Sequence, residues 1–241
     1  MEISGLIIAA GKGSRIEQLG SPKPLIKINN KALIDYVITA MLTSGIREIY
    51  VVVGYKSDQI INYLKKEYIN DNINIQFIIN DEWDKGNGIS VLCAKHYIEQ
   101  PFILSMSDHL YSFRIIKKLL LNDFSKADLF LATDLNMSNE FVDIDDVTKV
   151  KFNDNNRTII KIGKHIEEYN GYDTGVFYCN KNFFSALENA IKNGNDSISS
   201  AVEFLANNKR ALICDIEGEF WVDIDDIKAY ELAKDNISRL K

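Results

Sequence analysis

The first half of the chain alternates short apolar runs with segments whose apolar residues recur at helical spacing, and this alternation restricts the fold most. The apolar runs indicate buried strands at residues 4–9, 48–54, 74–80, 101–109 and 127–134. Apolar residues recur at helical spacing after Leu33, after Ser57, which is a candidate N-cap, and from about Ile89 to Ile98. Strands that alternate with helices predict a mainly parallel sheet covered by helices.

The second half adds shorter elements to the same pattern. Residues 147–163 predict a hairpin with its turn at residues 153–156, and two helices are expected after residues 171–179. Residues 210–225 predict two short strands before a terminal helix. No linker, repeat or low-complexity tract divides the chain, so we expect one domain over residues 1–241. The expected class is α/β, Rossmann-like, with a mixed, mainly parallel sheet flanked by helices.

Composition and charge narrow the class of protein. The 241 residues carry a formal net charge of -6, which argues against nucleic-acid binding, because phosphate backbones are held by clustered lysine and arginine. The three cysteines form no CxxC pair, so neither a disulfide framework nor a zinc site is expected. The sequence shows no signal-peptide pattern, and no apolar run approaches the roughly 20 residues of a membrane span. A cytoplasmic protein without membrane insertion is the expectation.

The loop after the first strand, "AAGKGSRIEQLGSPKPL", points to phosphate. Glycine turns at strand ends bind phosphate because backbone N–H groups point into the concavity, and Gly11 and Gly13 meet that need. The loop is neither a P-loop, which would need a glycine at Ala10, nor a dinucleotide fingerprint, which would need one at Ile16.

Two cations follow these glycines. Arg15 comes two residues after Gly13, and Lys23 stands between two prolines that restrict its backbone. A glycine turn with two fixed cations suits a triphosphate. An ordinary glycine turn with surface lysine and arginine is the alternative that these residues alone leave open.

Longer motifs carry a family resemblance. "LIIAAGKGSR" followed by "PKPL" resembles the signature of nucleotidyltransferases that join an NTP to a phosphorylated sugar or alcohol and release pyrophosphate; Ser14 and Ile16 are conservative replacements. "MSDH" and "WVDID" lie where that family keeps its metal-binding carboxylates. The resemblance covers the whole chain. It implies the GT-A-like nucleotidyltransferase fold, with an NTP-binding part at about residues 1–135 and an acceptor-binding part at about residues 136–241.

Within this superfamily, the chain most resembles the L-myo-inositol-1-phosphate cytidylyltransferases. The segments "NGISVLCAKHYI", "FILSMSDHLYS" and "IGKHIEEYNGYDTGVF" carry the likeness. It implies CTP and a phosphorylated small alcohol as partners, with CDP-inositol and pyrophosphate as products. Several relatives are fused to a membrane-bound lipid-phosphate synthase, which is not expected here, so the product would feed a separate membrane synthase. A homodimer is compatible with the sequence.

The resemblance also implies a magnesium site. Asp108 and Asp223 are the expected ligands, and Asp225 is a third ligand or a neighbour of the ligands. Magnesium prefers oxygen ligands and commonly takes one or two carboxylates beside phosphate oxygens. Without the resemblance, Asp108 would be read as a helix cap, and residues 223–226 as a solvated acidic helix start.

Nucleotidyl transfer joins two anionic partners, so positioning and charge neutralisation carry most of the catalysis. By resemblance, Arg15 neutralises the leaving pyrophosphate, Lys23 contacts the α-phosphate region and the acceptor phosphate, and Asp108 completes the catalytic set. Gly86 and Gly88 would allow a base to approach the backbone closely. The residues expected to bind the nucleotide are Ala9, Ala10, Gly11, Gly13, Arg15, Asn80, Gly86, Asn87 and Ser90.

The acceptor is expected to meet residues of the second half. By resemblance, these are Lys149, Lys164, Asp173 and Thr174. An ordinary exposed lysine is an equal alternative for Lys149 and Lys164. Asp134 is a further candidate to face the acceptor. We leave His109 outside the catalytic set, because a phosphate monoester is already largely ionised at pH 7 and needs no general base.

Other functions remain open from the sequence. The same chemistry could serve phosphocholine or aminoethylphosphonate with CTP, or a sugar 1-phosphate with UTP or dTTP, since fold and phosphate loop determine neither acceptor nor base. Outside enzymes, a regulatory module that binds nucleotide sugars is the alternative. A decayed site of that kind would be expected to lose one of Arg15, Lys23, Asp108 or Asp223, and all four are present. A glycosyltransferase is less compatible with Pro-Lys-Pro.

Overall fold

One mixed sheet forms the centre of the computed structural model, which describes residues 2–19, 22–69 and 72–240. In this sheet β1 lies between β4 and β6, β5 borders β4, and these four strands run parallel. Within the described residues it has nine strands: β1 (Ser4–Ala9), β4 (Glu48–Val53), β5 (Asn74–Ile79), β6 (Phe102–Met106), β8 (Leu129–Asp134), β9 (Lys149–Phe152), β10 (Ile159–Gly163), β11 (Gly171–Cys179) and β12 (Ala211–Asp215).

Strand β11 joins the two halves of the chain. It runs antiparallel to β6 on one side and to β8 on the other, and its first residues pair with β9 of the β9–β10 hairpin. β8 in turn pairs parallel with β12. Since β6 and β8 from the first half flank a strand of the second half, the sheet cannot be cut into two units. The expected single α/β domain with a mixed sheet is confirmed.

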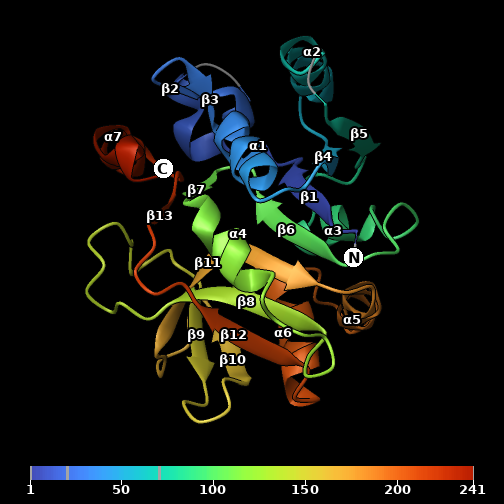
Figure 1. The fold of residues 1–241 in the computed structure, drawn as a ribbon, viewed down its shortest axis with the longest axis vertical. Coiled ribbons are helices and arrows are strands. Elements are labelled where there is room, and N and C mark those ends of the chain that lie inside the picture. Colours follow the sequence, from blue (N-terminus) through green and yellow to red (C-terminus); the bar gives the residue numbers. More distant parts are fainter. Residues whose placement is uncertain (1, 20–21, 70–71, 241) are drawn as a thin grey trace.

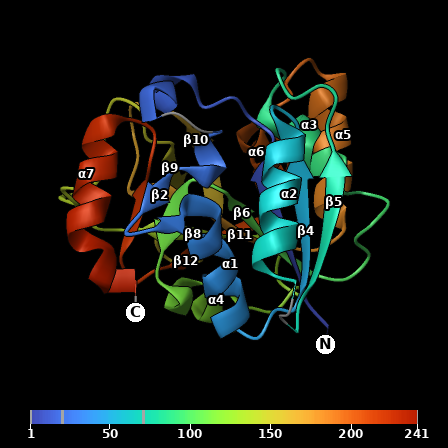
Figure 2. The same cartoon turned by 90° about the horizontal axis from the view of Figure 1, so that it is seen from above.

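Helices cover both faces of this sheet (Figures 1 and 2). Successive side chains of a strand point to opposite faces, so in β1 Leu6 packs into one core and Ile7 into the other. The helices over the Ile7 face are α1 (Leu33–Thr43), α2 (Ser57–Glu67) and α4 (Phe113–Leu119). Those over the Leu6 face are α3 (Asn87–Leu92), α5 (Asn182–Lys192) and α6 (Ile198–Asn207).

Two helix boundaries differ from the sequence expectation. The helix expected to Ile98 ends as α3 at Leu92 and continues as turns, although Ile98 is still buried. Lys56, and not Ser57, caps α2, because its carbonyl oxygen accepts the first helical hydrogen bond from the Gln59 N–H. Lys56 does so with a left-handed φ of 50°.

Smaller elements bring the two ends of the chain together. β7 (His109–Tyr111) pairs antiparallel with β13 (Trp221–Asp223), and this pairing sets Asp223 opposite His109. A small apolar cluster that includes Ile16, Leu110 and Val222 packs the loop after β1 against this pair. The remaining elements are β2 (Lys27–Ile28), β3 (Lys31–Ala32), α7 (Ile227–Asn236) and the 3₁₀ helices η1 (Ser14–Leu19), η2 (Lys23–Leu25) and η3 (Ile237–Leu240).

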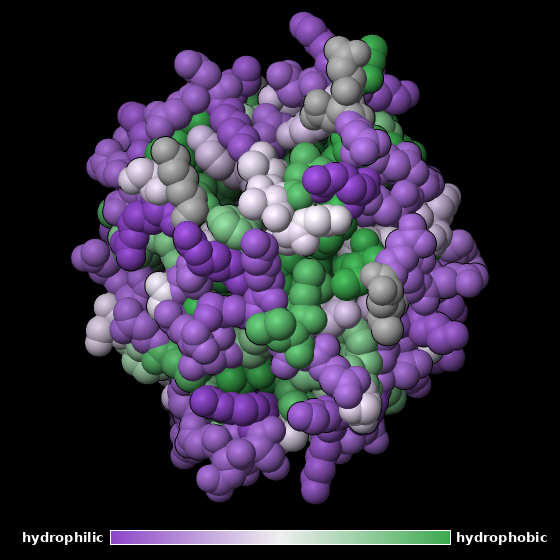
Figure 3. Space-filling model, viewed as in Figure 1, coloured by the Kyte–Doolittle hydropathy of each residue, from purple (hydrophilic) through white to green (hydrophobic). Residues whose placement is uncertain are grey.

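The surface agrees with the composition. The face in Figure 3 is mostly hydrophilic, and its hydrophobic side chains gather near the centre, where α1 and α4 lie in Figure 1. Among the described residues, no helix is both long and apolar enough to cross a membrane. Cys93, Cys179 and Cys214 are all free, as expected for a chain without a disulfide framework.

Candidate active site

The glycine loop follows β1 directly and packs on Lys23. Gly13 has a φ of +65°, and a Cβ at this position would lie 2.6 Å from the Cβ of Lys23. Only glycine satisfies both conditions without strain. Ala9 and Ala10 are buried at the end of β1, so their side chains are core residues, whereas Gly11 is exposed with open space around it.

Lys23 is a buried cation between two carboxylates. Its Nζ lies 2.6 Å from Asp108 Oδ2 and 2.5 Å from Asp225 Oδ1, and the residue is only 6% exposed. Burial alone would lower the pKa of Lys23, but attraction to Asp108, Asp223 and Asp225 raises it above its usual range. Burial alone would raise the pKa of Asp108, and Lys23 together with His109 lowers it instead. Lys23 and Asp108 therefore form a charged pair.

His109 connects the two expected metal ligands. Its Nδ1 lies 3.0 Å from Asp108 Oδ1, and its Nε2 lies 3.5 Å from Asp223 Oδ2. Burial works against the charged ring, but Asp223 and Asp108 raise the pKa of His109 to about 9. Sequence reasoning left His109 outside the site because the reaction needs no general base. Its position next to Asp108 in "MSDH" was the available signal.

The donor set fits a hard divalent cation. Ligand atoms of Asp108, His109 and Asp223 all lie within 4.8 Å of one another. Asp223 Oδ1 is buried and has no hydrogen-bond partner among the described residues, and burial raises the pKa of Asp223 to about 7. A buried carboxylate oxygen without a partner is costly unless a cation neutralises it. The two carboxylates are oxygen ligands of the kind magnesium prefers.

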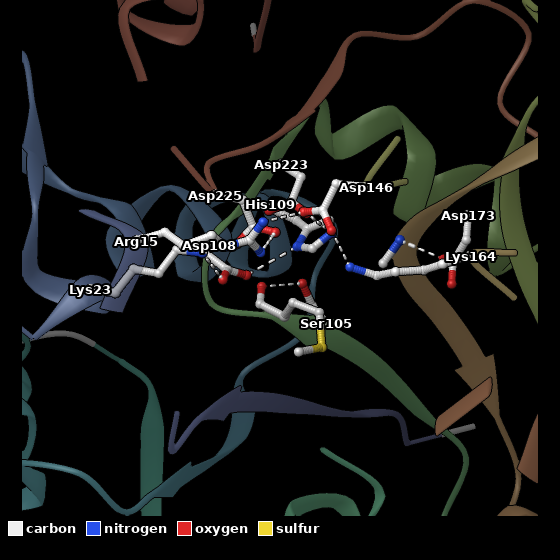
Figure 4. A network of polar contacts seen from close by, with 12 residues as sticks. Arg15, Lys23, Ser105, Asp108, His109, Asp146, Lys164, Asp173, Asp223 and Asp225 are labelled. Carbon is white, nitrogen blue, oxygen red and sulfur yellow. Dashed lines mark hydrogen bonds and ion pairs between the residues drawn. The ribbon is translucent and has the colours of Figure 1, made fainter. Parts of the chain in front are cut away.

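A second set of ion pairs extends from Asp225 across the site (Figure 4). Arg15 donates from Nη2 to Asp225 Oδ2 and from Nη1 to Asp146 Oδ2, both at 2.5 Å. Asp146 Oδ1 in turn lies 2.5 Å from Nζ of Lys164. Sequence reasoning missed Asp146. It belongs to the acidic run "DIDD" at residues 143–146, whose signal is indistinguishable from that of a solvated loop.

A cavity of about 280 Å³ opens beside these charges. Its wall combines residues of the loop after β1, the ends of β6 and β13, and the segment between β8 and β9. The expected site residues that line it are Arg15, Asn87, Asp108, Lys164, Asp173, Asp223 and Asp225. Those that the structure does not bring to its wall are Ala9, Ala10, Gly11, Gly13, Lys23, Asn80, Gly86, Ser90, Lys149 and Thr174.

Residues 80–90, several of which were expected to bind the nucleotide, are fastened to the residues just before α6. Asn80 donates to Ser90 Oγ at 2.9 Å, and both residues are buried. A Cβ at Gly86 would lie 2.2 Å from Asp196 Oδ1, while the Gly86 N–H donates to Asp196 Oδ2 at 2.8 Å. The close approach that requires glycine at this position is therefore to Asp196 of the chain itself.

Of the expected acceptor residues, Lys164 and Asp173 face the cavity. Burial raises the pKa of Asp173 to about 6. Lys149 does not line the cavity, and its Nζ donates to the carbonyl oxygen of Lys164 at 3.1 Å. Thr174 is fully buried, and its hydroxyl donates to the Ala132 carbonyl.

Asp134 also turns away from this cavity. It is 2% exposed, and its Oδ2 accepts hydrogen bonds from Asn139 Nδ2 at 2.7 Å and from Trp221 Nε1 at 2.8 Å. Its carboxylate is thus already satisfied within the protein. Asp134 fixes the Trp221 side chain, which lines the cavity, and does not itself face an acceptor.

The site sets cations that can hold phosphates beside carboxylates that can hold a metal. Transfer of a group between two anions requires both. A model of the MobA-like NTP transferase domain matches residues 5–146, more than half of the chain. The chain therefore belongs to the MobA-like NTP transferase family.

Similar curated proteins include bifunctional IPC transferases and a cytidylyltransferase. The bifunctional IPC transferase and DIPP synthase of Rubrobacter xylanophilus is 25% identical over 239 residues, which are 98% of this chain and 52% of that protein. Its namesake in Archaeoglobus fulgidus is 30% identical over 92% of this chain and 41% of that protein. The chain thus spans about half the length of these relatives. The CTP:phosphoglutamine cytidylyltransferase of Campylobacter jejuni is 32% identical over 77% of this chain and 76% of that protein.

Solved structures confirm the fold. The inositol-1-phosphate CTP transferase from T. maritima superposes with a TM-score of 0.86 at 22% identity, over 100% of this chain and 96% of that one. A UDP-glucose pyrophosphorylase complexed with UDP-glucose superposes with a TM-score of 0.80 at 18% identity, over 100% of both chains.

Proposed function

We propose that the chain transfers a cytidylyl group from CTP to a phosphorylated small alcohol, with inositol 1-phosphate as the leading acceptor. The observation that carries the proposal is the ion pair between buried Lys23 and half-buried Asp108, beside a cavity that Asp108, Arg15 and Lys164 line. Residues 1–135 would bind the NTP, and residues 136–241 the acceptor. The products would be CDP-inositol and pyrophosphate.

In this reaction an oxygen of the acceptor phosphate attacks the α-phosphorus of CTP, and the bond from that phosphorus to the β-phosphate oxygen breaks. Magnesium held by Asp108 and Asp223 would supply positive charge to the phosphate oxygens. Lys23 would neutralise the α-phosphate, and Arg15 the departing pyrophosphate. The exposed backbone at Gly11 would lie against the triphosphate.

Recognition of the acceptor would use opposite charges on one wall of the cavity. Lys164 offers a cation for the acceptor phosphate, and Asp173 offers a carboxylate for its hydroxyl groups. The names of the T. maritima enzyme and of the C. jejuni relative both specify CTP, although their acceptors differ. This agreement supports CTP as the donor more strongly than it supports any one acceptor.

A second acceptor follows from one comparison. The C. jejuni relative is named for phosphoglutamine, and the match covers 76% of that protein at 32% identity. Phosphoglutamine is therefore the alternative acceptor to test first, before phosphocholine and aminoethylphosphonate.

The test is release of pyrophosphate across a grid of nucleotides and acceptors. CTP, UTP, dTTP, ATP and GTP are each paired with inositol 1-phosphate, phosphoglutamine, phosphocholine, aminoethylphosphonate and glucose 1-phosphate, with magnesium or with EDTA. We expect a magnesium-dependent signal with CTP and inositol 1-phosphate. A signal with another acceptor would correct the substrate and keep the chemistry. If no combination releases pyrophosphate, a regulatory module that binds nucleotide sugars becomes the function to test.

A further inference from the structure

Asp146 joins a cation of the proposed NTP part to a cation of the proposed acceptor part. Its two carboxylate oxygens lie 2.5 Å from Arg15 Nη1 and 2.5 Å from Lys164 Nζ, respectively (Figure 4). Arg15 belongs to η1 after the first strand, and Lys164 directly follows β10. One carboxylate thus accepts hydrogen bonds from two cations that are far apart in the sequence.

Two cations that share one carboxylate are within reach of one phosphate. A phosphate group offers several oxygens and more negative charge than a carboxylate, and it forms the same charge-assisted hydrogen bonds with arginine and lysine. We infer that Arg15 and Lys164 form a single phosphate subsite that Asp146 fills from within the chain, and that a substrate phosphate enters this subsite by displacing the Asp146 carboxylate. The inference rests on the proposed function and deepens it.

The surroundings allow Asp146 to leave without unfolding its loop. The loop is held by its own backbone, because the N–H groups of Asp146 and Val147 both donate to the Asp143 carbonyl. The Asp143 side chain also accepts from the Asp145 N–H at 3.1 Å. None of these hydrogen bonds uses the Asp146 carboxylate.

Arg15 stays anchored when Asp146 leaves, because its Nη2 still contacts Asp225. The side chains of Arg15 and Lys164 are 54% and 44% exposed, and that of Asp146 is 29% exposed. Ion pairs this open to water are weak, so an incoming phosphate meets a small barrier.

The arrangement has two consequences for substrates. Asp146 competes with every phosphate that enters the subsite, so it lowers the affinity for anionic ligands. It also couples the two sides of the site, because a phosphate that releases Arg15 from Asp146 releases Lys164 as well. Both cations then contact the incoming phosphate in place of Asp146.

The test measures, by calorimetry in EDTA at fixed ionic strength, how tightly the parent protein and its variants bind pyrophosphate. We expect Asp146→Asn to lower the dissociation constant of pyrophosphate by about two- to fivefold, the range that weak surface ion pairs produce. Asp145→Asn is the matched control, since it removes the same charge from the same loop at an exposed position. The gain should disappear in Asp146→Asn combined with Lys164→Gln, because the freed lysine produces it.

Several results would overturn the inference. The first is that Asp146→Asn binds pyrophosphate as tightly as the parent or more weakly. The second is that Asp145→Asn gains as much affinity for pyrophosphate as Asp146→Asn, and the third is that neither variant nor the parent binds pyrophosphate. If Asp146→Asn does not fold, Lys164→Gln alone should weaken pyrophosphate binding, whereas Lys161→Gln at an exposed position of β10 should not. Equal effects of these two lysine variants would also count against the subsite. Turnover in the grid of nucleotides decides the proposed function separately, since it needs no change at Asp146.

Discussion

At the scale of single residues, the site depends on charges that water screens only in part, because their side chains are buried or half-buried. Lys23, Asp108 and Asp223 are joined through direct contacts and through the His109 ring. The same charges in water would attract one another weakly, since the interaction scales inversely with the dielectric constant. Each of these side chains is therefore expected to have an effect on turnover that an exposed aspartate lacks.

Asp108→Asn should reduce turnover by about 10²–10³-fold, the usual loss when one pre-organised electrostatic group is removed. Binding of magnesium, measured by direct titration, should weaken in the same variant. The melting temperature should change little, because Lys23 retains Asp225 as a partner. Asp145→Asn serves as the control of equal charge, and full activity of Asp108→Asn would refute the metal assignment.

Gly175→Ala tests whether the position of His109 matters. Gly175 has a φ of +74°, and a Cβ there would lie 2.5 Å from Cδ2 of His109. Gly194 is the matched control, because its φ is +82° and no atom lies within 4 Å of an added Cβ. Both alanine variants carry backbone strain of about 1–3 kcal/mol.

Only Gly175→Ala should also displace the imidazole, and we expect it to lose turnover by about 10²-fold, the effect of a small misplacement at a reacting centre. Turnover per folded molecule is the measurement, with urea unfolding to report the strain. Equal activity of the two variants would show that the position of His109 does not influence catalysis.

At the scale of elements, an ion pair between buried Asp128 and partly exposed Arg210 ties the start of β8 to the start of β12 and of α5. Asp128 is 6% exposed and accepts hydrogen bonds from Arg210 Nε and Nη2 and from the side-chain amides of Asn180 and Asn182. Hydrogen bonding to Arg210 is the largest cause that lowers the pKa of Asp128, to about 2.

This shift predicts a pH dependence of stability. Because the folded-state pKa is depressed below the value of about 4 for a free aspartate, the stabilisation is present in full above about pH 4. It is lost as the pH falls through about 2. Asp128→Asn should therefore lower the free energy of unfolding by about 2 kcal/mol at pH 7, and the difference from the parent should shrink below pH 4.

Urea unfolding at several pH values measures this effect. Asp235→Asn, at an exposed position of α7, is the control and should change stability little at any pH. A constant difference between Asp128→Asn and the parent down to pH 2 would contradict the assignment to the ionised carboxylate.

At the scale of the whole molecule, the single sheet predicts cooperative unfolding. β11 lies between β6 and β8 and pairs with both. Residues 1–135 alone would therefore lack the strand that joins β6 to β8. We expect one transition with coincident circular dichroism and tryptophan fluorescence signals. Residues 1–135 expressed alone should lack a cooperative transition. Two separate transitions in the full chain would indicate independent units instead.

The expected site was recoverable to different degrees. Arg15, Asp108 and Asp223 were predicted from motifs that resemble the family signature, and the structure brings all three to one cavity. Asp146 was missed, because an acidic loop carries no local sign of what it contacts. His109 was left outside the catalytic set, although it directly follows Asp108 in the sequence. Thr174 and Asp134 were expected to face a ligand, yet their hydrogen bonds lie within the protein.

The amino-acid sequence alone predicts the alternation of strands and helices, the glycine loop and, through its motifs, the class of chemistry. These depend on side-chain periodicity and on short motifs, both of which are local. Which charges meet depends on the folded chain, because contacts such as that of Arg15 with Asp225, 210 residues apart, require strand pairing and packing along the whole chain. Pairing of β7 with β13 sets Asp223 opposite His109, and no local pattern specifies that register.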